Sequence, residues 1–278
     1  MSRQLNLRIA AVTRTKSRQS GILRTIYTSK IIKAGALIAD TKTLLAHWDE
    51  TLSVAENLEQ SQKNNIFGKA SRSRVKDILT IFRQRYLTAE SVTKALVALV
   101  NSNFPAEGLN SILYFHATQS DRLLYDTVTD LLASMHRVGR QDISVNDVKN
   151  WIGFQIVQGK TQGQWSSATV TRCAVALLST LRDFGILQGA VKKRLAPIYL
   201  PVEAFAYIAL YLRQNQPSGL KLIHAKEWEL FFLSSKAVEQ FFMEAHQHRL
   251  LEYYAAGSVI RITFPTESLQ EYACVIAS

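Results

Sequence analysis

Apolar positions recur at helical spacing along much of the chain, most clearly between residues 144 and 184. Ser144 followed by Asp147 is the pattern of a capping box at a helix start, and a second apolar periodicity begins near Ser166 or Ser167. Gly185 follows this second helix, where a left-handed residue commonly ends one. The pattern predicts two amphipathic helices joined by a short turn.

Beyond Gly185, short apolar stretches predict a hairpin in which residues 186–187 pair with residues 198–200. Lys192, Lys193 and Arg194 would then lie at its tip, where cations suit phosphates. The outward face of the second helix carries small residues and Arg172, so this helix could approach a groove closely. Residues 119–201 are therefore predicted to form a central winged helix. The alternative is a packing module without a DNA-binding role.

Residues 34–118 predict an N-terminal helix-turn-helix domain, with a long helix that begins at Ser71 or Ser73 and reaches Tyr86. Six basic residues surround that helix: Lys69, Arg72, Arg74, Lys76, Arg83 and Arg85. Cations in the first turn, such as Arg72 and Arg74, do not stabilise a helix. There they can share a phosphate with free backbone N–H groups, which favours a binding role over a merely solvated face.

Residues 202–278 predict a third unit that is again winged-helix-like. Alternating residues from Leu250 to Phe264 form the clearest hairpin of the chain, with a turn at residues 255–258. The helix before it, expected to be capped by Ser235, presents Lys236 and Glu244 outward among polar residues. Such a face does not suit phosphates, so we expect a structural or protein-binding role here.

Together these patterns predict a mainly α fold of helix-turn-helix and winged-helix modules with short β-hairpin wings.

The remaining part, residues 1–33, is predicted to be a basic arm. Eight basic residues and no acidic one precede Asp40, whereas the rest of the chain holds 25 basic and 22 acidic residues. A positive arm on a nearly balanced body is typical of a polyanion-binding protein. A solubilising tail is the alternative, and a membrane-surface segment is disfavoured because apolar residues of the arm alternate as in a strand.

Several functional classes are disfavoured by what the sequence lacks. It contains no apolar run long enough to span a bilayer and no secretory signal, and its two cysteines make no disulfide framework, so we expect a cytoplasmic protein without membrane contact. Nucleotide-binding glycine loops and common hydrolase motifs are also missing. His246 and His248 lie two residues apart and would point in different directions on a helix, which disfavours one shared metal. We therefore expect no catalytic residues, no metal and no cofactor.

A family resemblance is carried mainly by the region around the long basic helix. Its residues are Glu56–Leu58, Asn65–Lys69, Ser71–Arg74 and Phe82–Tyr86, and the segments 95–115, 123–132 and 165–187 fit in the same order. Over roughly Thr28 to Pro201 the chain resembles the BrxA family of BREX (bacteriophage exclusion) systems. The resemblance implies a largely helical, DNA-associated protein of phage defence. The basic extension before Thr28 and a longer C-terminal part depart from the family.

The sequence thus predicts a non-enzymatic component of a BREX-type system that binds double-stranded DNA and accompanies other BREX subunits. A protein–protein adaptor and a transcriptional regulator remain alternatives. The candidate DNA-binding residues are Arg14, Lys16, Arg18, Lys69, Arg72, Arg74, Lys76, Arg83, Arg172, Lys192, Lys193 and Arg194.

Overall fold

The protein is described from a computed structural model, which covers residues 26–102, 104–197, 199–216, 218–257 and 259–277. Arg14, Lys16, Arg18 and the rest of the predicted arm up to residue 25 lie outside the described residues. Below, residues 34–118, 119–201 and 202–278 are called the N-terminal, middle and C-terminal units. The described chain is mainly helical, as predicted, with two small antiparallel sheets.

The first part of the described chain is entirely helical between its loops. Its helices are α1 (Ile31–Ala34), α2 (Ile38–Ala46), α3 (Val54–Lys63), α4 (Arg72–Tyr86), α5 (Glu90–Asn101) and α6 (Ala106–Ser120). Ser71, not Ser73, caps α4, because its side chain accepts from the backbone of Arg74. The predicted apolar face of α4, from Val75 to Tyr86, is buried. The local pattern therefore fixed this helix correctly.

The middle unit begins with one continuous helical run of a normal turn, a π-helical stretch and another normal turn. Its elements are α7 (Arg122–Asp126), η1 (Thr127–Leu132), α8 (Ala133–Arg137), β1 (Asp142–Ile143), α9 (Val145–Val157), α10 (Ser167–Asp183), β2 (Leu187–Gln188) and β3 (Lys193–Leu195). Ser144 and Asp147 form the predicted capping box of α9. Ser166 caps α10, and Gly185 follows with a φ of 82°. These predictions are confirmed.

The predicted pairing of the hairpin is wrong. Strand β2 pairs with β3, not with residues 198–200, and β1 pairs with the other edge of β3 to make a three-stranded sheet. The turn closes early because Gly189, at φ 95°, brings its Cα against the backbone of Lys192, where a Cβ would lie 2.0 Å from the carbonyl oxygen. Leu195 then faces Leu187 and is buried. Consequently Lys193 and Arg194 lie in a strand, and only Lys192 lies in the turn.

The C-terminal unit contains more helix than the sequence predicted. Its elements are α11 (Val202–Arg213), α12 (Gly219–Ile223), the 3₁₀-helix η2 (Lys226–Phe231), α13 (Ser235–Gln247), β4 (Glu252–Ala256), β5 (Val259–Thr263) and α14 (Leu269–Ile276). Ser234, not Ser235, caps α13 through the backbone N–H of Ala237. The β4–β5 hairpin is confirmed, but Ala255 and Ala256 are paired strand residues, so its turn is shorter than predicted. Helix α14 was not predicted.

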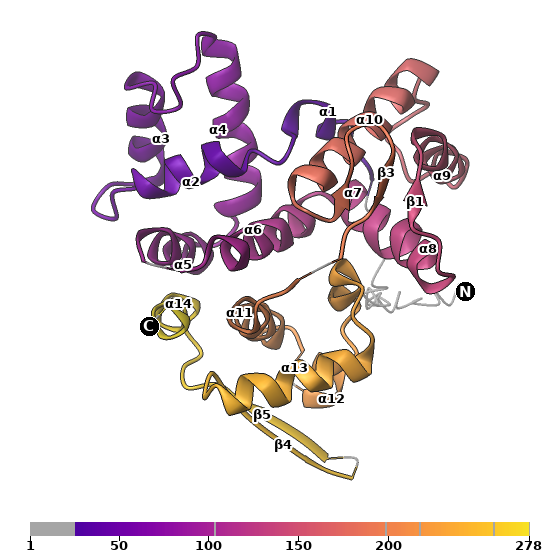
Figure 1. Cartoon of the computed structure of the whole chain (residues 1–278). Coiled ribbons are helices and arrows are strands. Elements are labelled where there is room, and N and C mark those ends of the chain that lie inside the picture. Colours follow the sequence, from indigo (N-terminus) through magenta and orange to yellow (C-terminus); the bar gives the residue numbers. More distant parts are fainter. Residues whose placement is uncertain (1–25, 103, 198, 217, 258, 278) are drawn as a thin grey trace, which may run out of the picture.

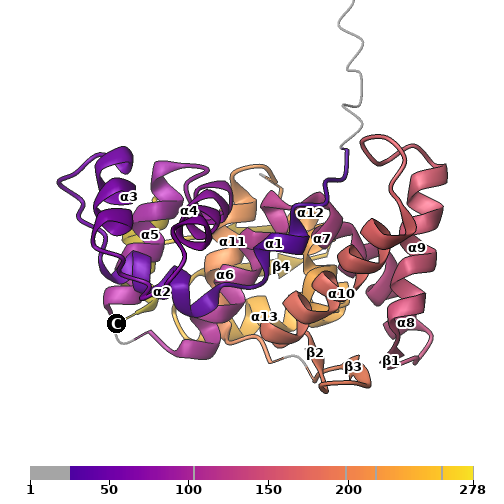
Figure 2. The ribbon, with the colours of Figure 1, turned by 90° about the horizontal axis from the view of Figure 1, so that it is seen from above.

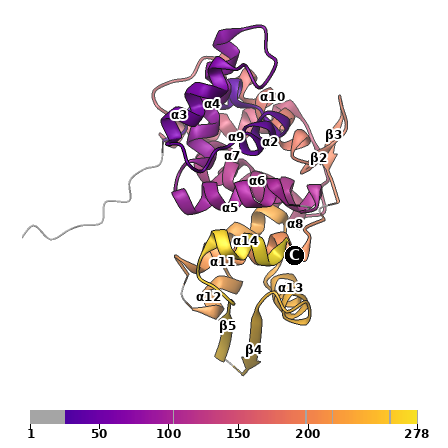
Figure 3. The ribbon, with the colours of Figure 1, turned by 90° about the vertical axis from the view of Figure 1, so that its left-hand side faces the viewer.

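Long-range packing joins the three units through one contiguous apolar core. In Figures 1 and 3, α14 lies beside α5, so the end of the chain packs on the N-terminal unit. Helix α6 packs on α11 in the same way, and the β4–β5 hairpin projects from the side of the molecule opposite α3 and α4. Figure 2 shows α1 between α4 and α10, with contacts to both. The N-terminal segment thus bridges the first two units.

Candidate nucleic-acid interface

Helix α10 presents the small-residue face that its sequence predicts. Ala168, Arg172 and Val175 are exposed, whereas Cys173 and Leu177 on the other side are fully buried. Burial raises the pKa of the Cys173 thiol to about 11, so this cysteine is a protonated core residue. The Arg172 side chain forms no ion pair with any other described residue. One free cation therefore stands among short side chains on the outer face of α10.

The β2–β3 hairpin carries two of its three cations outward. Lys192 and Arg194 are exposed, whereas Lys193 is half-buried and its Nζ donates to the carbonyl oxygen of Ala190 at 2.9 Å. With the amide of Gln188 turned to accept, Arg194 Nε donates to Gln188 Oε1 at 2.7 Å. That bond orients the guanidinium across the sheet. The hairpin therefore offers the exposed ammonium of Lys192 in the turn and, on the strand, the guanidinium of Arg194 held by Gln188.

The junction of the predicted arm lies beside the turn between α9 and α10. Tyr27 pairs with Thr161 in a parallel bridge, and its backbone N–H donates to the carbonyl oxygen of Lys160 at 2.7 Å. Its ring is buried against Trp151, with ring centroids 6.1 Å apart, and its hydroxyl donates to Asp126. These contacts join distant parts of the chain, so sequence patterns alone did not reveal them. They fix the start of the described chain next to the helix pair.

The basic residues around α4 form two groups, one exposed and one that contacts other parts of the protein. At 100° per residue, Arg72, Lys76 and Arg83 fall on one stripe, and all three are exposed. None of the three side chains makes an ion pair with another residue in the described ranges. This stripe is a second cationic surface, about 16 Å long from the helical rise.

The other basic residues near α4 are engaged by the protein itself. Lys69 Nζ lies 2.9 Å from an Asp40 carboxylate oxygen, and Arg74 Nη1 donates to the carbonyl oxygen of Lys33 at 3.1 Å. Arg85 does not lie on the surface as the sequence suggested, because it is only 3% exposed and donates to the carbonyl oxygen of Ala36. Of the candidates in this unit, Arg72, Lys76 and Arg83 are the best placed for a partner.

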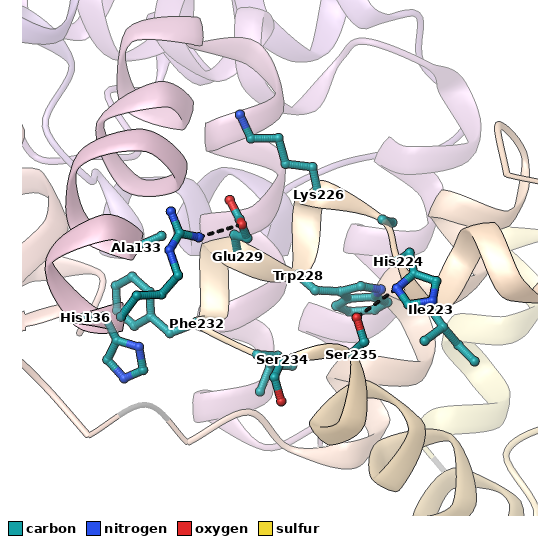
Figure 4. Close-up of a pocket in the computed structure, with 13 residues that line it drawn as sticks. Ala133, His136, Ile223, His224, Lys226, Trp228, Glu229, Phe232, Ser234 and Ser235 are labelled. Carbon is teal, nitrogen blue, oxygen red and sulfur yellow. Dashed lines mark hydrogen bonds and ion pairs between the residues drawn. The ribbon is translucent and has the colours of Figure 1, made fainter. Parts of the chain in front are cut away.

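A concave site lies at the seam between α8 and the C-terminal unit (Figure 4). The cavity measures about 590 Å³. His136 stacks on Phe232 at its edge, with ring centroids 5.0 Å apart, and Arg137 pairs with Glu229 at 2.9 Å.

In the same cavity His224 Nδ1 lies 2.8 Å from Ser235 Oγ, a distance compatible with a nucleophile–base pair. Among the described residues, however, no carboxylate hydrogen-bonds to His224 to orient its ring, as such a pair requires. We therefore interpret the cavity as part of the packing between the two units.

The part of the chain that the structure describes contains neither a cluster of metal-ligating side chains nor a helix that could span a membrane. No group of three or more His, Cys, Asp or Glu side chains there is arranged to hold a metal ion. His246, one of the residues considered from the sequence, has its Nδ1 3.4 Å from the backbone nitrogen of Tyr253. The described helices are all too short or too polar to cross a membrane.

The family model of BrxA matches residues 25–210 of the chain. The chain belongs to the BrxA family. Membership associates this BrxA-family protein with BREX phage defence. The matched range covers the N-terminal and middle units and most of α11, and it ends before α12. Both cationic surfaces described above therefore lie within the family region.

A solved structure agrees with the fold. It is titled as the crystal structure of an uncharacterized protein from Magnetospirillum magneticum, and it is 15% identical with a TM-score of 0.57. The similarity covers 72% of this chain and 97% of the other. At that identity the likeness concerns the fold alone. No protein with a curated description matches the BrxA-family chain.

Proposed function

We propose that this BrxA-family protein is a non-enzymatic component of a BREX-type defence system that binds double-stranded DNA. The observation that carries the proposal is the outer face of α10, where Arg172 stands among small residues without an ion-pair partner in the described ranges. The β2–β3 hairpin beside it supplies Lys192 and Arg194. Such a helix fits a major groove, while cations on a flanking hairpin hold phosphates.

The element order of the middle unit supports a winged-helix assignment. A helical run, a short strand, two helices and a hairpin follow one another, and the hairpin pairs back onto β1. In this arrangement α10 acts as the recognition helix and the β2–β3 hairpin as the wing. The turn before α10 exposes Gln162 and Gln164, whose amides can donate to phosphates or bases.

The arm and α4 would add phosphate contacts. Tyr27, near the start of the described chain, contacts Lys160 and Thr161 in the turn before α10, and Arg14, Lys16 and Arg18 precede it in the sequence. The stripe of Arg72, Lys76 and Arg83 offers a second cationic surface. Contacts of this kind give affinity without sequence preference, because phosphates are the same at every base pair.

A salt series of electrophoretic mobility shifts, with random and native duplexes, tests the proposal. If roughly six phosphates are neutralised, log K should fall with log salt with a slope near −5. The binding should be similar for random and native duplexes. A slope near zero, or no shift at low salt, would contradict DNA binding. Binding confined to the protein's own promoter would instead identify a transcriptional regulator.

A second candidate function, a protein–protein adaptor, is favoured by exposed apolar residues on α9. Phe154 is 60% exposed and Val157 is 81% exposed. Large apolar side chains that remain in solvent often mark a protein-binding surface. Substituting both with serine should then abolish co-purification with other BREX subunits and leave DNA affinity unchanged. Loss of both activities would point to misfolding instead.

The proposal also holds that chemistry in the system belongs to other subunits. Purified protein is incubated with magnesium and, separately, with ATP, S-adenosylmethionine and plasmid DNA. We expect no hydrolysis, methylation or nicking. Activity that persists through further purification would contradict this part of the proposal, and Glu244, His246 and His248 would be the first residues to substitute if nicking appeared.

A further inference from the structure

A cavity of about 360 Å³ lies where three distant segments of the chain meet. Its walls come from the segment that begins at Ile26, from the C-terminal end of α4 and from the junction of α6 and α7. Three cationic residues line it: Lys30, Arg85 and Arg122. The proposed DNA surface uses none of these residues.

Arg85 is the unusual member of this cavity wall. Its side chain is only 3% exposed, and one guanidinium nitrogen, Nη1, donates to the carbonyl oxygen of Ala36 at 3.2 Å. The other nitrogen, Nη2, is buried without a hydrogen-bond partner among the described residues. A buried charged donor without an acceptor is unfavourable, so the protein alone leaves this guanidinium incompletely satisfied.

The other charges of the cavity leave an excess of positive charge. Arg122 is paired with Asp126 at 2.7 Å, whereas Lys30 is exposed at the edge and forms no ion pair with a described residue. Asp121 also lines the cavity, but its Oδ1 accepts from the backbone of Leu124. Burial raises the pKa of Asp121 while Arg85 and Lys30 oppose that rise. Of the residues that line the cavity, one carboxylate, Asp121, thus faces three cations, and one of these, Arg122, is already paired.

We propose that this cavity binds the phosphoryl group of a small phosphorylated ligand, with Arg85 and Lys30 as its principal cationic contacts. A guanidinium supplies paired N–H donors that match a phosphate, and the ammonium at the edge adds a point charge. The cavity is larger than a phosphate ion needs and falls within the size range of small-molecule sites, so a group attached to the phosphate fits as well.

Bound phosphate would join segments that belong to different units. It would contact the segment at Tyr27 that holds the arm junction, the end of α4 and the start of α7. A ligand that binds only the folded state stabilises it in proportion to ligand concentration. Occupancy should therefore raise the melting temperature and slow hydrogen exchange of the backbone amides around residues 26–30.

The experiment uses the full chain with inorganic phosphate, a nucleoside 5′-monophosphate or acetate as probe, at constant ionic strength. About 10 mM monophosphate should raise the melting temperature by roughly 2–4 °C if the dissociation constant is near 1 mM. Inorganic phosphate should give a smaller shift and acetate almost none. A shift equal for acetate and monophosphate would show a carboxylate-tolerant or nonspecific effect and would overturn the proposal.

Variants separate this cavity from the DNA surface. Arg85→Lys keeps the positive charge but loses the paired N–H donors of the guanidinium. Lys30→Gln changes an exposed side chain that does not support the core. Both should lose at least half of the monophosphate shift. Arg83→Gln, on the exposed stripe of the same helix, is the matched control and should keep it, as should Arg172→Ala.

If Arg85→Lys fails to fold, Lys30→Gln and the exchange of amides 26–30 decide the question. An undiminished shift in Lys30→Gln, or no shift in the wild-type protein, overturns the proposal. The wild-type result would mean that water satisfies Arg85. Because the DNA-surface variants are measured alongside, a failure here does not bear on DNA binding, and a failure of DNA binding does not remove the cavity.

Discussion

The middle and C-terminal units each contain a long helix followed by a β-hairpin, but they differ in the surfaces they present. In the middle unit α10 exposes small residues around Arg172, and its hairpin joins β1 in a three-stranded sheet. In the C-terminal unit α13 exposes Lys236, Met243 and Glu244, and β4 and β5 form a two-stranded hairpin. The order of helices therefore does not separate the proposed DNA-binding unit from the C-terminal one, and the proposal rests on the charge and size of the exposed side chains.

The largest expected effect comes from the hairpin of the middle unit. Substituting Lys192, Lys193 and Arg194 together with alanine should weaken binding to every duplex by roughly 10- to 100-fold, with a salt slope closer to zero by about 2. The slope should change by less than three full contacts because Lys193 already binds Ala190. Mobility shifts across a salt series measure both quantities. Unchanged affinity would mean that this hairpin has only a packing role.

The pH dependence of the free energy of unfolding should show whether the N-terminal and C-terminal units unfold together. His116 on α6 lies 3.0 Å from the Tyr207 hydroxyl on α11, and burial lowers its pKa to about 3 from 6.5. Below pH 6.5 the unfolded chain takes up a proton that the folded protein excludes. The free energy of unfolding should therefore fall by about 1.4 kcal/mol per pH unit towards pH 3, roughly 2 kcal/mol at pH 5.

Denaturant unfolding of wild type and His116→Gln at pH 7 and pH 5 measures this effect. The variant should lose that part of the pH dependence, while His248→Gln, a change at an exposed position, should keep it. A single transition seen by probes in both regions would show that the units share one cooperative core. Separate transitions, with only one of them sensitive to pH, would contradict that view.

A smaller change is expected for a single residue on α10. Arg172→Ala should weaken DNA binding by roughly 10-fold and change the salt slope by about 1, since one phosphate contact is lost. Its control is Arg182→Ala, near the end of the same helix, because Arg182 is already paired with Asp183 at 2.7 Å. Equal losses in both variants would mean that α10 contributes only general positive charge.

The smallest effect is expected from the C-terminal unit. Lys236→Ala combined with Arg261→Ala removes exposed cations from α13 and β5 and should change duplex affinity by less than about 2-fold, since distant surface charges are screened by salt. A filter-binding titration at moderate salt measures the ratio. A loss as large as that of Arg172→Ala would abolish the contrast between the units and make α13 a second DNA-binding helix.

Local features of the fold could be predicted from the sequence because they depend on neighbouring residues. The capping box of Ser144 and Asp147, the Ser166 cap and the buried face of α4 all arise within a few turns of one helix. The exposed face of α10 followed from the same periodicity. For these elements, the spacing of the residues along the chain determines on which face of the helix each side chain lies.

Contacts between distant segments were decided only by the tertiary structure. Lys69, Arg74 and Arg85 have the same formal charge as Arg72. Long-range packing gives them Asp40, Lys33 and Ala36 as partners, whereas Arg72 has no ion-pair partner in the part of the chain that the structure describes. The pairing of β3 with β1, the docking of α14 on α5 and the anchoring of Tyr27 beside Lys160 have the same origin. Periodicity specifies which face of a helix is buried, whereas the folded chain determines which side chain lies opposite it and so which cations remain available to a partner.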